Sequence, residues 1–162
     1  MSRCVTLEEI TALEALYTAG ASKTLAPARA QLAGRWRAGE RDRETALRLA
    51  FLDWYSCSEP QFLTGLPDVS SSQAVEEGFF LPTCEHLLAA HPGDVEVLFA
   101  LGWMLTSHPW CAGGASTSDV EARGRVVWTA YLTSPIELGD AVFNDRGTYG
   151  IYFAHIQATK RR

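Results

Sequence analysis

The sequence predicts an all-α fold in a single domain, and three observations indicate it. Apolar residues recur at helical spacing over most of the chain, and capping or helix-ending residues flank these runs. No segment alternates apolar and polar residues with the β-branched enrichment of a strand. The 162 residues are 47% hydrophobic and 20% charged, as in an ordinary globular protein. We therefore expect one helical domain, residues 1–162, built around one core.

The first part of the chain predicts three helices with clear ends. A helix over residues 6–20 begins at Thr6, with Glu9 at the spacing of a capping box. A second is expected from about 27 to 38, with a proline in its first turn and a glycine after its end. The third, about 41–57, carries apolar residues on so much of its surface that two faces must be covered. It is therefore the expected central helix.

Four more helices are expected in the rest of the chain, which makes about seven. They cover about residues 72–90, 95–107, 118–133 and 148–159. Pro82 should kink or break the first, because its ring removes a backbone hydrogen bond. Asp94 should cap the second, and Ser118 with Glu121 should form a capping box on the third. Arg146 is expected to form a structural turn that holds the last helix.

The spacing around the turn HPGD resembles part of a tetratricopeptide repeat. The apolar and small residues at the packing positions of two successive repeat helices are Phe80, Cys84, Leu87, Leu98, Leu101, Gly102 and Leu105. The resemblance covers about 35 residues, roughly one repeat. A glycine-rich loop follows where the next repeat helix is due. We therefore expect one isolated tetratricopeptide-like hairpin, about residues 77–107, inside an irregular bundle.

Cysteine and histidine side chains are zinc ligands, but their spacing here predicts no metal site. The candidates are Cys84, His86, His91, His108 and Cys111. His91 and His108 flank one expected helix, so they should lie roughly 20 Å or more apart. Since no Cys-x-x-Cys pair occurs, Cys4, Cys57, Cys84 and Cys111 are interpreted as buried free thiols in a reducing cytoplasm. No metal and no cofactor are expected.

Charge and motif content argue against several function classes. The formal net charge of −5 disfavours binding to nucleic acid or anionic lipid, which needs clustered basic residues. Glu8, Glu9 and Glu14 interrupt the apolar run that a secretory signal would need, and no apolar run approaches the ~20 residues of a membrane span. We therefore expect a cytoplasmic protein without a membrane span. No catalytic signature accompanies the loop carboxylates, so no enzyme and no catalytic residues are expected.

Two segments resemble parts of small bacterial helical proteins that are similar to immunity proteins of polymorphic toxin systems. They are WYSCSEPQFLTGLP and FNDRGTYGIYFAH, and together they cover about a fifth of the chain. The resemblance implies a stoichiometric inhibitor that binds a toxin made by the same cell and blocks its active site.

Partner-binding residues are expected in the loops. The candidates are Glu59, Asp68, Trp110, Asp119 and Asp145. Their carboxylates would face a basic cleft on a protein partner, and a buried aromatic ring would supply much of the residence time. One alternative is a helical adaptor or chaperone that holds a peptide or an effector protein in a groove. Another is a small helical enzyme, which requires a pocket with at least two convergent titratable groups.

Overall fold

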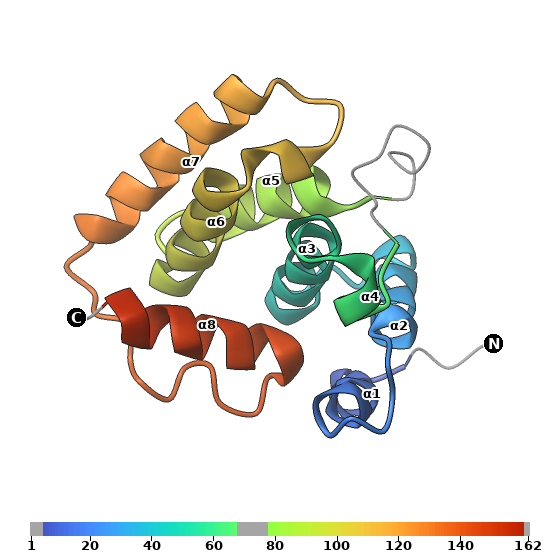
Figure 1. The fold of residues 1–162 in the computed structure, drawn as a ribbon. Helices are drawn as coiled ribbons and strands as arrows, with labels where there is room; N and C mark the ends of the chain where they lie inside the picture. Colours follow the sequence, from blue (N-terminus) through green and yellow to red (C-terminus); the bar gives the residue numbers. More distant parts are fainter. Residues whose placement is uncertain (1–4, 68–77, 161–162) are drawn as a thin grey trace.

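The computed structural model describes residues 5–67 and 78–160, and over these ranges the fold is all-α without a strand. The predicted fold class is therefore confirmed. The helices are α1 (Leu7–Thr18), α2 (Ala26–Arg37), α3 (Arg43–Ser58), α4 (Gln61–Thr64), α5 (Phe80–Ala90), α6 (Val95–Ser107), the 3-10 helix η2 (Pro109–Ala112), α7 (Thr117–Leu132) and α8 (Gly147–Lys160). Figure 1 shows the arrangement. None of the helices in the described ranges is long and apolar enough to cross a membrane.

Two helices, α1 and α6, begin at the capping residues that the sequence predicts. The hydroxyl of Thr6 accepts a hydrogen bond from the Glu9 amide at 3.2 Å, and the Glu9 carboxylate accepts one from the Thr6 amide at 2.7 Å. This is the predicted capping box. At the start of α6, Asp94 accepts hydrogen bonds from the amides of Glu96 and Val97. The predicted cap of that helix is confirmed as well.

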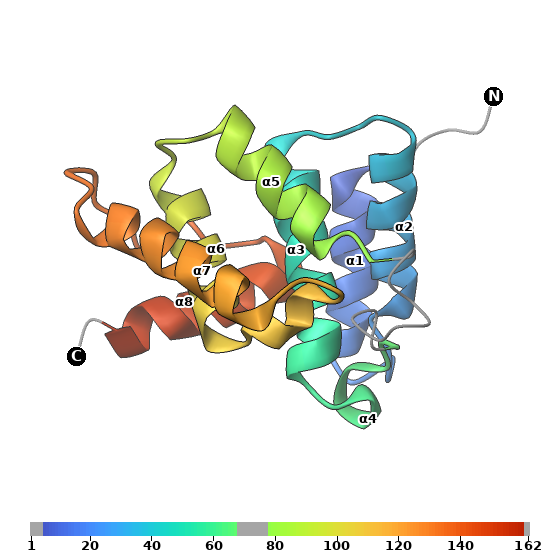
Figure 2. The ribbon, with the colours of Figure 1, turned by 90° about the horizontal axis from the view of Figure 1, so that it is seen from above.

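Helix α3 lies at the centre of the bundle, between α2 and α8 in Figure 1 and beside α5 in Figure 2. Eleven of its sixteen residues are buried, so neighbours cover more than one of its faces. Its largest buried side chain, Trp54, is 1% exposed, and its indole N–H donates to the carbonyl of Met104 in α6 at 3.1 Å. The expectation of a central third helix is confirmed.

Helix starts were predicted wrongly at two places. Helix α5 begins at Phe80, so Pro82 lies in its first turn, where a missing N–H removes no helical hydrogen bond. The expected kink is therefore absent from α5, and residues 72–77 of the expected helix lie outside the described residues. Helix α7 is capped at Ser116, which leaves Ser118 inside its first turn and overturns the Ser118–Glu121 capping box.

Helix α6 packs most closely against α7, through two glycines. A Cβ atom on Gly102 would lie 3.0 Å from the Cα of Trp128, and one on Gly124 would lie 2.8 Å from the Cβ of Leu105. Small residues here let the two backbones approach. The expected tetratricopeptide-like hairpin, about residues 77–107, corresponds to α5 and α6, and its kinship with that repeat stays a prediction.

Two glycine-to-alanine substitutions should change stability in opposite directions. Gly124→Ala should lower the free energy of unfolding by about 1–3 kcal/mol, because its Cβ overlaps α6. Gly34→Ala, in the exposed interior of α2 with no atom within 4 Å, should raise it by about 0.5–1 kcal/mol. Urea denaturation of both variants measures the difference. Equal effects at the two positions would contradict the close packing of α6 on α7.

Arg146 holds the start of α8 against the bundle, as the sequence predicts. Its guanidinium forms ion pairs with Glu44 of α3 and Glu96 of α6 and donates to the Val142 carbonyl at 2.9 Å. The hydroxyl of Tyr149 also donates to Glu96, at 2.6 Å. One arginine therefore joins the last helix to two core helices.

Candidate functional site

Two of the five predicted binding residues, Glu59 and Trp110, lie near one another at the carboxyl-terminal end of α3. Glu59 is the C-cap residue of α3. Trp110 belongs to η2, which a disulfide between Cys57 and Cys111 fastens to the last turn of α3, with a Cα–Cα distance of 5.5 Å. His108 relates the two: its ring packs against Trp110, and it lies within electrostatic reach of Glu59.

The disulfide corrects the interpretation of the cysteines as free thiols. Cys57 and Cys111 lie 54 residues apart in the sequence, and only the packing of η2 against α3 brings them together. Of the cysteines in the described ranges, Cys84 alone is a free thiol. Burial raises the pKa of that thiol well above its usual range. The cysteines therefore no longer support a reducing compartment.

A stack of rings connects Trp110 to the buried core. Trp54 packs edge-on against His108 with ring centroids 5.3 Å apart, and His108 packs against Trp110 at 5.0 Å. Burial lowers the pKa of His108, and the nearby Glu59 carboxylate opposes this shift. The imidazole therefore favours its neutral form, which suits the apolar contact with both indoles. Trp110 is 55% exposed at the outer end of this stack, so its ring is both available and held in position.

Exposed apolar side chains continue the surface on the other side of Glu59. Phe62 and Leu63 of α4 are 84% and 51% exposed, and Leu16 of α1 is 49% exposed. The hydroxyl of Tyr17 donates to the Leu63 carbonyl at 2.9 Å, which joins the end of α1 to α4. Both views place α4 beside the end of α3 (Figures 1 and 2). Phe62 and Leu63 are two exposed large apolar side chains in one four-residue helix, and contiguous apolar surface of this kind marks interaction sites.

Three tyrosines, Tyr17, Tyr55 and Tyr152, belong to the same region. The rings of Tyr55 and Tyr152 lie 5.9 Å apart, and Tyr17 and Glu59 lie within electrostatic reach of Tyr55. Burial raises the pKa of Tyr55 to about 12, so its hydroxyl stays protonated. We call the whole region the α3-end surface. It consists of Leu16, Tyr17, Tyr55, Glu59, Phe62, Leu63, Trp110 and Tyr152.

The remaining predicted binding residues do not belong to the α3-end surface. Asp119 is exposed in the first turn of α7, where a carboxylate stabilises the helix by itself. Asp145, with φ +56°, precedes α8 and lines a depression of about 610 Å³ together with Glu44. Glu44 and Glu59 are fifteen residues apart on α3, which corresponds to roughly 22 Å. Asp68 lies outside the described residues.

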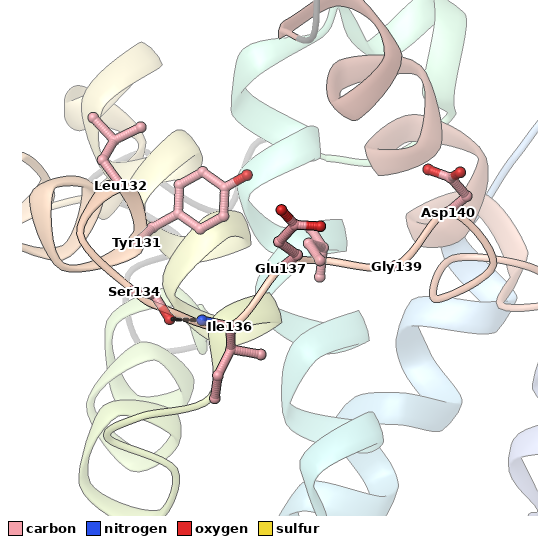
Figure 3. A pocket seen from close by; sticks show the side chains of 8 residues that line it. Tyr131, Leu132, Ser134, Ile136, Glu137, Gly139 and Asp140 are labelled. Atoms are coloured by element: carbon pink, nitrogen blue, oxygen red, sulfur yellow. Dashed lines mark hydrogen bonds between the residues drawn. The ribbon is translucent and has the colours of Figure 1, made fainter.

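A second depression, of about 510 Å³, lies between the end of α7 and the loop that follows it. Figure 3 shows that Tyr131, Glu137 and Asp140 line it. The hydroxyl of Ser134, at its edge, accepts a turn hydrogen bond from the Ile136 amide at 3.2 Å. Both carboxylates come from one loop, residues 134–140, rather than from separate elements.

The zinc-ligand residues considered above do not converge in the structure. Within residues 5–67 and 78–160, no three His, Cys, Asp or Glu side chains are placed to hold a metal ion together. Cys111 lies near His108, but its sulfur is bonded to Cys57. His86 contacts the backbone instead, with its Nε2 atom 2.8 Å from the Arg41 carbonyl.

Four features of the α3-end surface were not predicted: Phe62, Leu63, the tyrosines and the disulfide. The sequence carried a partial signal for Phe62 and Leu63, because QFLT follows a helix-ending Glu-Pro pair and so places two apolar residues in a short segment, although it does not show which way they face. The chain matches no family model, no curated protein and no solved structure. Geometry and charge are therefore the basis for assigning a function.

Proposed function

We propose that this chain is a protein-binding inhibitor of the immunity type, and that its α3-end surface contacts a cognate bacterial toxin at a basic cleft. The observation that carries the proposal is Trp110, an exposed indole held by a ring stack that begins in the core. Tryptophan and tyrosine are over-represented among the residues that dominate binding energy at interfaces. A ring already fixed in its bound position loses little entropy on binding.

Charge supports a basic partner. Glu59 lies between the apolar part of the surface and Trp110, and no ion pair to it is found among the described residues. The chain as a whole carries a formal net charge of −5. An acidic chain attracts a basic cleft over a distance of about one Debye length, roughly 8 Å at physiological salt, and so raises the association rate.

A cytoplasmic location belongs to this proposal, with a toxin that acts inside the cell. The formation of the Cys57–Cys111 bond then depends on the redox state of the cell, because cytosolic thiols are generally kept reduced.

A helical adaptor that binds an apolar peptide is the second candidate. Phe62, Leu63 and Leu16 favour it, since three exposed apolar side chains on neighbouring helices can receive the side chains of a peptide. The two candidates differ in the partner: the inhibitor binds a folded basic protein, and the adaptor binds an extended segment.

Replacing Trp110 with alanine tests the proposed function. The wild-type chain and two variants, Trp110→Ala and Val126→Ser, are immobilised, and the proteins that they retain from a lysate of the source organism are quantified. Val126, 70% exposed on α7, is the matched control because it is an exposed apolar residue on another helix. With the purified partner, Trp110→Ala should weaken affinity by about 30-fold or more, the loss expected for a central aromatic anchor.

The control and the salt dependence decide the outcome. Val126→Ser should leave affinity within about threefold of wild type, because it lies away from the α3-end surface. The association rate should fall as ionic strength rises from low to physiological values. Equal affinities for wild type and Trp110→Ala, or an association rate that does not change with salt, would contradict the proposal. A toxin-like gene beside the gene for this chain would support the inhibitor over the adaptor.

A further inference from the structure

The disulfide is the main directional link between η2 and α3. The backbone hydrogen bonds of η2 are local, from the Cys111 amide to the His108 carbonyl at 3.0 Å and from the Gly113 amide to the Trp110 carbonyl at 3.4 Å. Within the described ranges, no hydrogen bond joins η2 to another helix. Its other contacts, with α3, α5, α6 and α7, are packing contacts that bury Pro109 and Cys111, and contacts of this kind fix the segment without a directional bond.

The segment after η2 permits such a shift. Gly113 and Gly114 adopt positive φ angles of +56° and +62°, a conformation that glycine reaches without steric cost. Two adjacent glycines also have the largest conformational freedom once a constraint is removed. Without the bond between the sulfurs, the backbone around Trp110 is held where it leaves α6 at Ser107 and where it enters α7 at Thr117, and the two glycines let the part between them move.

We propose that Cys57 and Cys111 form a redox switch that controls whether Trp110 is presented on the α3-end surface. The inference rests on the proposed function, because it regulates the same surface. In the oxidised chain the bond holds η2 and its indole against α3. In the reduced chain η2 loosens, Trp110 leaves its stack on His108, and the partner loses a pre-positioned contact.

The chemistry of the switch balances with a low-molecular-weight disulfide as the oxidant. The thiolate of one cysteine attacks this disulfide and forms a mixed disulfide, releasing one small thiol. The second cysteine then displaces the other small thiol and closes the Cys57–Cys111 bond. Two protons and two electrons leave the chain, and the small disulfide is reduced to two thiols. Reduction by two equivalents of small thiol reverses the same steps.

The exposure of each cysteine determines which of them can take part in thiol–disulfide exchange. Cys84 is 1% exposed and cannot take part. Cys57 is half-buried and Cys111 is 3% exposed, so a small thiol reaches the bond from the Cys57 side. Cys57 lies in the last turn of α3 and two residues before Glu59, where the negative end of the helix and the carboxylate disfavour a thiolate. The exchange should therefore be slow without an oxidoreductase.

The first test needs no partner. Hydrogen–deuterium exchange is measured on the oxidised chain, on the chain reduced with a phosphine, and on the double variant Cys57→Ser with Cys111→Ser. Thiol titration verifies each redox state. Amides of residues 110–116 should exchange at least tenfold faster in the reduced chain and in the double variant, whereas the buried part of α6, residues 97–105, should be unchanged. The variant Cys84→Ala should respond to the reductant as wild type does.

The second test uses the partner that the retention experiment with Trp110→Ala identifies, after purification. Affinity should fall at least tenfold on reduction of the wild-type chain and should not respond to reductant in the double variant. Unchanged exchange of residues 110–116 overturns the switch. Reduction that unfolds the whole chain, seen as loss of helical circular dichroism, also overturns it, because the bond is then a structural cross-link. Equal affinities in both redox states overturn the switch but leave the proposed function in place. Failure of both forms to bind any partner overturns the proposed function itself.

Discussion

Replacing Arg48 with methionine should lower the free energy of unfolding by about 3–5 kcal/mol, the loss typical of a broken buried ion pair. Arg48 is 2% exposed and pairs with the fully buried carboxylate of Glu14. It also donates to the Thr11 hydroxyl at 2.9 Å, so it joins α3 to α1. Methionine fills a similar volume but leaves Glu14 as a buried charge without its partner.

The loss of stability in Arg48→Met should depend on pH in a defined direction. Burial raises the pKa of the Glu14 carboxyl above its ordinary value of 4.5, and Arg48 opposes that rise. Without Arg48, the folded-state pKa rises further. The Glu14 carboxyl of the variant then binds more protons in the folded state than in the unfolded state. This difference favours the folded state below pH 4.5, and the advantage is lost as pH rises through the folded-state pKa. The destabilisation should be smaller at pH 5 than at pH 7.5.

Urea denaturation at the two pH values measures this effect. Two further variants test whether the loss comes from the unpaired, buried Glu14 carboxylate. Arg125→Ala breaks an exposed pair with Glu121 on α7 and should change stability by no more than about 0.5 kcal/mol. Glu14→Leu added to Arg48→Met removes the stranded carboxylate and should restore part of the loss. Similar losses for Arg48→Met and Arg125→Ala would show that the buried pair does not hold α1 to α3.

The double variant Cys57→Ser with Cys111→Ser should lose about 4 kcal/mol of stability. The 54-residue separation of the two cysteines determines this value, because a cross-link over a loop of that length removes a corresponding amount of chain entropy from the unfolded state. Denaturation of oxidised wild type, reduced wild type and the double variant measures it. Reduced wild type and the double variant should agree, and a double variant as stable as oxidised wild type would contradict the prediction.

The sequence predicted the parts of the fold that local signals determine. The Thr6–Glu9 box, the Asp94 cap and the apolar surface of α3 each depend on residues within one or two turns of helix. The Cys57–Cys111 bond and the Glu14–Arg48 pair depend instead on residues 54 and 34 positions apart, which only tertiary packing brings together. Spacing along the chain contains no information on such contacts.

The candidate site was predicted in part, for a related reason. Trp110 and Glu59 were selected because both were expected in loops, and loops lie at the surface and often carry binding residues. Asp119 and Asp145 met the same criterion, but α7 and α8 carry them away from the end of α3. Phe62 was missed because one exposed phenylalanine cannot be told from a buried one without knowing which face of α4 meets α3.

Site-specific photo-crosslinking tests the central claim, that the α3-end surface contacts the partner, most directly. A photoreactive amino acid is placed at position 63, within the surface, or at position 126 on α7, where the side chains of Leu63 and Val126 are both exposed. After irradiation in the presence of the partner, the chain labelled at 63 should form a covalent complex and the chain labelled at 126 should not. A covalent complex from 126 without one from 63 would place the interface elsewhere and contradict the proposal.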